Sequence, residues 1–174
     1  FGMGTPIGTH FAPHNPAYVD LTAQSAYDPE KSKALLAEAG FPDGFETTLH
    51  LPPPSYARRG GEIIAAQLAQ VGIKAELDAM PVRTYWPELR KDAYDMYLLG
   101  WSPGTFDAEH PIRFLAHTPN KEKKLGSWNF GDFSNPRIDE MLAPIQSEID
   151  PAKRQAMLDE AAKILQDEVA YVTL

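Results

Sequence analysis

Residues 45–79 read FETTLHLPPPSYARRGGEIIAAQLAQVGIKAELDA, and they carry the clearest pattern of secondary structure in the chain. Apolar and polar residues alternate over 46–51 and again over 73–79, which is the pattern of half-buried β-strands. Between the two strands lies a helix that Gly72 ends, and three apolar residues mark its buried face: Ile64, Leu68 and Val71. A strand, a helix and a second strand in this order predict a parallel βαβ unit.

The same pattern continues on both sides of this stretch. Asp28 and Pro29 predict the start of a helix, because aspartate accepts the free amide hydrogens of a first turn and proline has none to lose; Gly40 predicts its end. Residues 83–91 predict a short helix, and residues 96–99 form an almost continuously apolar third strand. We therefore predict an α/β fold with a mostly parallel sheet, flanking helices and right-handed crossovers.

The rest of the chain is predicted to consist of loops and helices. Residues 1–27 are rich in glycine and proline, so we expect a loop-rich first segment. Two Asx-Pro pairs, at 135–136 and 150–151, predict the starts of the last two helices, and we expect Ile149 on the apolar side of the first. Residues 171–174 have the composition of a strand.

Composition limits the possible functions. The chain has 174 residues, which suits one domain spanning 1–174, and it contains no cysteine, which excludes disulfides and thiolate chemistry. Sixteen Lys and Arg against 24 Asp and Glu give a formal charge of −8, so nucleic acid is not expected as a partner. The basic cluster at 121–124 is interpreted as a solvated loop. No apolar run reaches the length of a membrane span.

The loop after the third strand is the best candidate for a binding site. Ligands of open parallel sheets collect beyond the carboxyl ends of the strands, where the loops diverge. Trp101 offers a flat apolar wall at such an end, and three residues after it offer hydrogen-bond partners: Ser102, Thr105 and Asp107. The alternative is that Trp101 belongs to the core and that the polar residues only form a turn.

Two arginines stand at the start of the second predicted helix. A cation is mildly unfavourable there because the first turn carries the positive end of the helix dipole. An anionic ligand group would explain Arg58 and Arg59 in these positions. Placement toward solvent without any function explains them as well.

Enzyme signatures are absent from the sequence, which contains no nucleophile elbow, zinc-protease helix or phosphate-binding glycine loop. We therefore expect a protein that is not an enzyme and that needs no cofactor. An alternative is a small hydrolase or metal-dependent enzyme that uses Asp107, Glu109 and His110. A third possibility is a plain interaction module, which would present a broad apolar surface and no cleft.

Six short motifs occur together in this chain. They are Tyr27-Asp28-Pro29-Glu30-Lys31, the run ALLAEAGFPDGF at 34–45, the segment 64–74, Tyr94-Asp95-Met96, Gly100-Trp101, and Ser134-Asn135-Pro136. In combination these motifs resemble the dipeptide and oligopeptide type of ABC-transporter solute-binding proteins. The resemblance covers essentially the whole chain, and its motifs are specific only in combination.

The resemblance implies one lobe of a two-lobed periplasmic-binding-protein fold of type II. Such a receptor is periplasmic or tethered to the membrane outside the cytoplasm, closes its two lobes over a small peptide or peptide-like solute, and presents the solute to a permease. The ends of the chain agree with an excised C-terminal lobe of a longer protein. The implied partners are the ligand, the N-terminal lobe and the permease subunits of the transporter.

Two departures from the family pattern bear on the ligand. Peptide-binding members commonly have an Asp three residues after the strand-end Trp, where this chain has Gly104. Dipeptide binders place an Arg near the end of the first strand, where this chain has Leu51. A charged peptide end that lacks its partner in a closed cleft loses several kcal/mol. We therefore expect a free dipeptide to bind poorly.

The loop also resembles the glutathione-binding branch of the family, through Gly100-Trp101-Ser102, residues 105–108 and Arg113. This resemblance implies that Asp107 is the partner for a ligand amine. The candidates to meet an anionic ligand group are three arginines: Arg58, Arg83 and Arg113.

Overall fold

The structure is a computed structural model that describes residues 5–11, 13–91, 93–102, 104–105 and 107–174. In the structure the chain divides into two compact units. Unit 1 is built from Phe1–Ala26 and Ser102–Leu174, and unit 2 is the continuous segment Tyr27–Trp101. Each unit has a hydrophobic core of its own.

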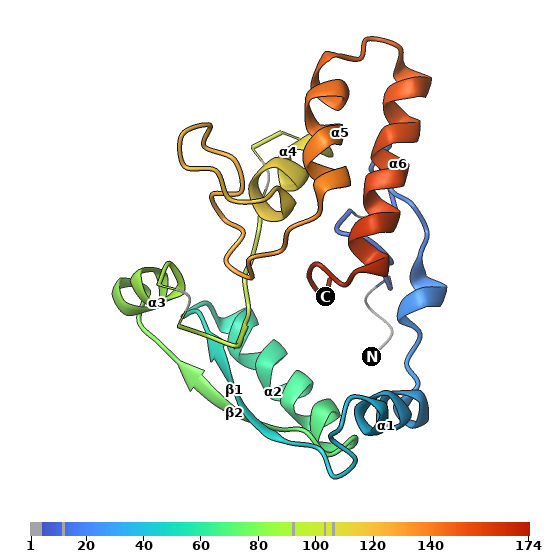
Figure 1. The fold of residues 1–174 in the computed structure, drawn as a ribbon. Coiled ribbons are helices and arrows are strands. Elements are labelled where there is room, and N and C mark those ends of the chain that lie inside the picture. The colour runs from blue at the N-terminus through green and yellow to red at the C-terminus, as the bar shows by residue number, and fades with distance from the viewer. Residues whose placement is uncertain (1–4, 12, 92, 103, 106) are drawn as a thin grey trace. The chain divides into compact units, whose positions relative to one another are not determined.

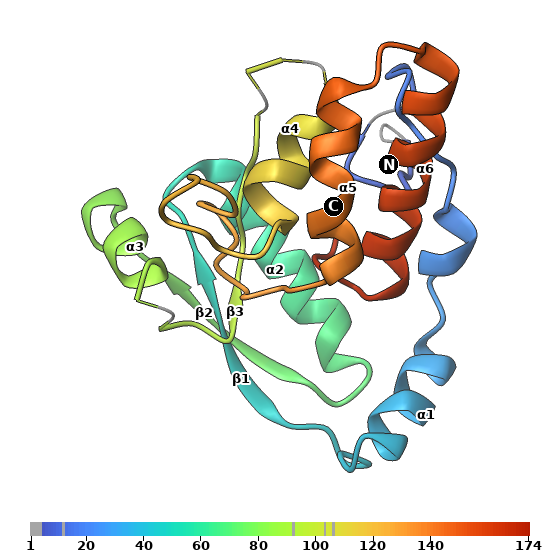
Figure 2. The same ribbon diagram turned by 45° about the horizontal axis from the view of Figure 1, so that its top comes forward.

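Unit 2 is an α/β layer in which the predicted order of elements is confirmed (Figure 1). Its three strands form one parallel sheet in the order β2-β1-β3, and α2 runs along one face of that sheet in both views (Figure 2). The elements are α1 (Pro29–Glu38), β1 (Glu46–Leu51), α2 (Ser55–Ala69), β2 (Lys74–Ala79), α3 (Val82–Leu89) and β3 (Met96–Tyr97).

The third strand is shorter than predicted. We expected a strand over 96–99, and the structure has one over Met96–Tyr97, paired with Leu49 and His50 of β1. The ladder extends one step further, because the Leu98 N–H donates to the His50 carbonyl at 3.1 Å. The segment after that bond leaves the sheet and leads into the predicted binding loop.

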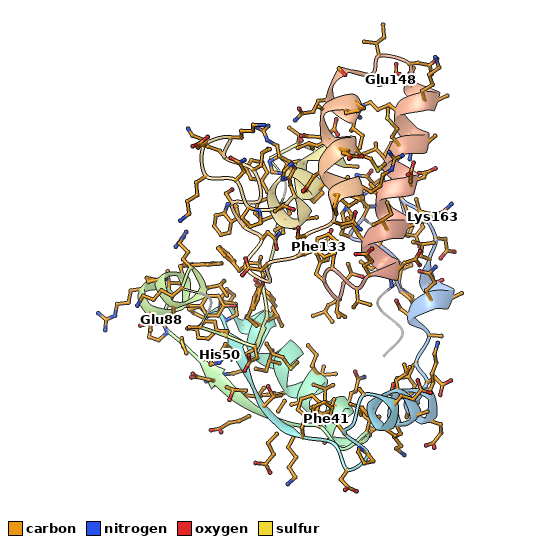
Figure 3. The ribbon with its side chains drawn as sticks, viewed as in Figure 1. Phe41, His50, Glu88, Phe133, Glu148 and Lys163 are labelled. Carbon is orange, nitrogen blue, oxygen red and sulfur yellow. The ribbon has the colours of Figure 1, made fainter. Side chains whose placement is uncertain are left out.

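Both glycine-ended helices of unit 2 have the predicted geometry. The Asp28 side chain accepts the Lys31 N–H at the start of α1. At the helix ends, the Phe41 N–H donates to Leu36 and the Ile73 N–H donates to Leu68, and both bonds span a glycine with positive φ. Figure 3 shows Phe41 just after α1.

The core of unit 2 joins the sheet to α2. Its buried members are Leu49, Leu51, Ala57 and Leu98. Gly61 in α2 lets the helix approach closely, because a Cβ there would lie 2.7 Å from a methyl carbon of Leu51. This contact fixes the first turns of α2 against the end of β1.

Unit 1 is mainly helical. After the predicted binding loop, residues 109–116 form a short α-turn followed by a π-turn. Both Asx-Pro starts are confirmed, with Asn135 and Asp150 accepting backbone N–H groups. The elements are η1 (Thr22–Ser25), α4 (Glu109–Pro111), η2 (Ile112–Ala116), α5 (Pro136–Ser147) and α6 (Pro151–Asp167).

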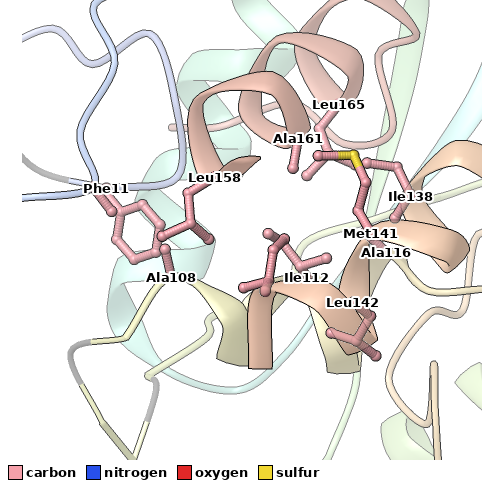
Figure 4. Packing of buried hydrophobic residues seen from close by; sticks show 12 residues of the cluster. Phe11, Ala108, Ile112, Ala116, Ile138, Met141, Leu142, Leu158, Ala161 and Leu165 are labelled. Carbon is pink, nitrogen blue, oxygen red and sulfur yellow. The ribbon is translucent and has the colours of Figure 1, made fainter. Parts of the chain in front are cut away.

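The core of unit 1 gathers residues from distant parts of the sequence (Figure 4). Phe11 from the first segment belongs to the same buried cluster as Ala108, Ile112 and apolar residues of α5 and α6. The first segment is loop-rich, as predicted, and it nevertheless contributes to this core.

Two expectations for unit 1 are wrong. Ile149 is 94% exposed, because α5 ends at Ser147 and places it in the turn before α6. Residues 171–174 form no strand in the described structure; the Tyr171 hydroxyl bonds instead to Nδ1 of His10, which draws the segment onto unit 1.

Candidate functional site

The carboxyl edge of the sheet in unit 2 positions three of the predicted site residues. Because all three strands are parallel, their carboxyl ends lie at the same edge. Arg58 stands in the first turns of α2 after β1, Arg83 near the start of α3 after β2, and Trp101 after β3. Both arginines are exposed and Trp101 is half-buried. The topology therefore brings these three predicted residues to one edge.

Tyr56 is a residue at this edge that the sequence reasoning missed. It lies in the first turn of α2, and its hydroxyl reaches the backbone of Gly100 beyond β3. A Cβ on Gly100 would lie 2.3 Å from the Tyr56 oxygen, so a larger residue at 100 would displace the ring. The only signal in the sequence was an aromatic residue a few positions after a predicted strand.

Tyr85 stabilises the segment that leads from β3 to Gly100. Its side chain is fully buried, and its hydroxyl donates to the Leu98 carbonyl at 2.6 Å. Burial raises the pKa of the Tyr85 phenol, so this group stays a protonated donor at neutral pH. The bond fixes the backbone two residues before Gly100.

His50 and Tyr94 add an aromatic stack on the sheet of unit 2. The two rings lie 3.9 Å apart and nearly parallel, and Nδ1 of His50 lies 3.3 Å from a carboxylate oxygen of Asp78 on β2. Figure 3 shows His50 on β1. This group stabilises the strands rather than extending beyond their ends.

The other predicted site residues belong to unit 1. Ser102 and Thr105 are exposed, whereas Pro103 and Phe106 of the same predicted loop lie outside the described residues. Asp107 is half-buried and forms a two-pronged ion pair, with both carboxylate oxygens accepting from Nη2 of Arg154 at 2.9 and 3.0 Å. It also accepts the Glu109 N–H at 2.9 Å.

These contacts determine the charge state of Asp107. Partial burial raises the pKa of its carboxyl, but the hydrogen bonds from Arg154 and the Glu109 N–H, together with the charge of Arg154, outweigh this effect and lower the pKa below its ordinary value. The carboxylate is thus ionised at neutral pH and already paired. A cationic ligand group would have to compete with Arg154 for it.

Arg113 stands in the π-turn of unit 1. Its Nε is buried and has no hydrogen-bond partner among the described residues, and its guanidinium carbon lies 5.4 Å from the centre of the Phe114 ring. A cation over an aromatic face is stabilised by the ring quadrupole. Arg113 is therefore held partly by aromatic contact and is less available than the exposed arginines of unit 2.

The three residues of the enzyme alternative do not gather as a metal site. Glu109 accepts a hydrogen bond from Gln146, and the His110 ring packs on Phe114 at 4.7 Å. Within the described part of the chain, no group of three or more His, Asp or Glu residues is placed to hold a metal ion. Among these same residues, no helix has the length and apolarity that crossing a membrane requires.

The fold defines a class of protein, that of type II periplasmic-binding-protein fold, and the chain covers part of one lobe. Residues 1–123 match the family described as bacterial extracellular solute-binding proteins, family 5 Middle. The chain belongs to this family, as its motifs predicted.

Relatives of known name support the assignment. The glutathione-binding protein GsiB of Escherichia coli (strain K12) is 32% identical over 179 residues, which cover 99% of this chain and 34% of GsiB. The chain therefore spans about a third of the length of the curated relatives that it matches. These relatives are binding proteins and not enzymes, which confirms that expectation.

Solved structures show the same fold. MoaA from A. tumefacien R10, in complex with mannopinic acid, superposes with a TM-score of 0.82 and 25% identity, covering 95% of this chain and 33% of that one. The ABC transporter-associated periplasmic binding protein DppA from Helicobacter pylori, in complex with the peptide STSA, superposes with a TM-score of 0.79 and 23% identity. The match covers 94% of this chain and 32% of that one. The predicted fold class is confirmed.

Proposed function

We propose that this chain is part of the substrate-binding component of an ABC importer, which captures small peptides or peptide-like solutes between two lobes and delivers them to a membrane permease. The observation that carries the proposal is the match to family 5 over residues 1–123, with 32% identity to a glutathione-binding protein over nearly the whole chain. A periplasmic location belongs to the same proposal.

The contacts of unit 2 support a binding role for its strand edge. Trp101 supplies a half-buried apolar wall, and Arg58 and Arg83 supply exposed cations for an anionic solute group. Ser102 and Thr105 remain predicted hydrogen-bond partners in unit 1, and Arg113 remains a predicted cation there. For Asp107, the pair with Arg154 supports a structural role instead.

Calorimetry with two probes tests the proposal. We expect the full-length protein to bind glutathione with micromolar affinity, which corresponds to about −8 kcal/mol. We expect the dipeptide Met-Leu to bind at least ten-fold more weakly, since Gly104 and Leu51 stand where charged partners are expected. The chain of 174 residues alone should bind far more weakly than the full-length protein, because it supplies only part of the contacts.

Controls separate the roles of the acidic and basic residues. Asp107→Asn should leave the affinity for glutathione within two-fold while lowering stability, and Arg58→Gln should weaken binding. Equal affinity of the chain and the full-length protein would argue against a shared site. Failure of the full-length protein to bind either probe would overturn the proposed substrate class.

A further inference from the structure

We propose that Tyr56 contacts the ligand at the strand edge of unit 2. We also propose that residue 100 is glycine because a larger side chain there would displace the Tyr56 ring. The proposal rests on the proposed function, because it names a residue of the same binding site. The chemical class of ligand is a solute with a peptide carbonyl or carboxylate, which a phenol hydroxyl can reach as a donor.

The position of Tyr56 is set by the elements that meet there. Only three residues separate the end of β1 at Leu51 from the start of α2 at Ser55. The next residue after Tyr56, Ala57, is fully buried, and Gly61 packs one turn later against Leu51. The backbone of Tyr56 is therefore held by the core of unit 2.

The side chain crosses from α2 to the segment that follows β3. A Cβ built on Gly100 would meet three atoms of Tyr56, at 2.3 Å from the hydroxyl oxygen, 3.2 Å from Cζ and 3.8 Å from Cε2. No other residue would contribute one of the three nearest atoms. By contrast, a Cβ on Gly104 would meet nothing within 4 Å. The glycine at 100 thus has a specific neighbour, which is the phenol end of Tyr56.

The hydroxyl of Tyr56 remains available for a ligand. The residue is 56% exposed, and its hydroxyl has no hydrogen-bond partner among the described residues. Tyr27 is also exposed, but its hydroxyl donates to Gln70 at 2.7 Å. A tyrosine offers a large, rigid contact area at low cost in side-chain entropy, and carboxyl ends of parallel strands are where solutes bind. Exposure, an available donor and position together point to ligand contact.

Calorimetry of glutathione binding to the full-length protein tests the role of Tyr56. We expect Tyr56→Phe to weaken binding about three- to ten-fold, as for the loss of one hydrogen bond, and Tyr56→Ala to weaken it more. Tyr27→Phe removes a hydroxyl from a tyrosine of the same unit and should change the affinity by less than two-fold. Thermal unfolding of each variant without ligand shows whether it is folded.

A double-mutant cycle tests the role of Gly100. Gly100→Ala alone should weaken binding at least ten-fold, because it displaces the Tyr56 ring. In the Tyr56→Ala background the same change should add less than two-fold, since the ring is already gone. Additive effects would overturn the role of Gly100. If Gly100→Ala does not fold, the Tyr56 variants alone decide the ligand contact.

The outcomes distinguish this proposal from the proposed function. Binding of glutathione by the wild-type protein, with unchanged affinity in Tyr56→Phe and Tyr56→Ala, would overturn the role of Tyr56 and leave the function standing. Binding of neither glutathione nor Met-Leu by the wild-type protein would overturn both.

Discussion

His10 shows how one buried side chain makes the stability of unit 1 depend on pH. Its ring packs against Phe11 at 4.3 Å, its Nδ1 shares a hydrogen bond with the Tyr171 hydroxyl, and its Nε2 is buried without a hydrogen-bond partner among the described residues. Burial lowers the pKa of His10 to about 4, because the charged ring would lose its hydration. The folded protein therefore holds His10 neutral.

We predict that stability falls as the pH drops from 7 to 5. Over this range the unfolded chain binds a proton on His10 (ordinary pKa 6.5) and the folded chain does not, so protonation favours unfolding. The expected loss is about 2 kcal/mol at pH 5, and it continues as the pH approaches 4. Urea unfolding of the wild type and of His10→Gln at both pH values measures it; an equal loss in the variant would contradict the role of His10.

At the scale of elements, the glycine pair Gly44 and Gly72 joins the loops before β1 and before β2. Both residues have positive φ, and a Cβ on Gly44 would lie 2.0 Å from the Gly72 carbonyl oxygen. Since that neighbour is backbone, it cannot move aside without disturbing the sheet. This close approach allows the two parallel strands to begin in register at Glu46 and Lys74.

We predict that Gly44→Ala lowers the free energy of unfolding by about 3 kcal/mol or more, from a strained backbone and a clash. Gly40→Ala is the matched control, because Gly40 has a similar φ of 91° but open space around it. Its cost should be about 1 kcal/mol, from the backbone alone. Denaturant unfolding measures both, and equal losses would show that the contact with Gly72 is unimportant.

The elements that could be predicted are those with local signals. The helix starts at Asp28, Asn135 and Asp150 depend on neighbours in sequence, and so do the glycine ends of α1 and α2. Ile149 could not be placed, because the helical pattern continues past the point where α5 ends. A short motif predicts the local turn in which it lies. It does not predict where a helix ends when tertiary packing determines that end.

For the whole molecule, we predict that the two units lose their structure independently. Leu51 is 1% exposed in the core of unit 2, and Ile138 is 0% exposed in the larger core of unit 1. Each change to alanine should lower the stability of its own unit by about 3 kcal/mol. Leu51→Ala should therefore speed hydrogen exchange mainly in 27–101, and Ile138→Ala mainly in 102–174. Mass spectrometry of peptides reads both regions. Equal acceleration in both units by either change would indicate a single cooperative unit.

The division into two units and the full candidate site could not be predicted from the sequence. Phe11 joins the core of α5 and α6 through contacts between residues far apart in the chain, which no local pattern reports. The same is true of Arg154, which pairs with Asp107, and of Tyr56, which meets Gly100. Arg58, Arg83 and Trp101 were predictable because strand order alone brings them to one edge.

Unit 2 is one uninterrupted segment with unit 1 on both sides of it in the sequence. Two splice points, at 26–27 and at 101–102, are therefore enough to exchange it as a cassette. The donor segment would bring its own Tyr56 and Gly100 counterparts together, so this pair of residues would never be mismatched. We expect such an exchange to transfer the proposed strand-edge site as one piece while leaving the helical core of the recipient intact.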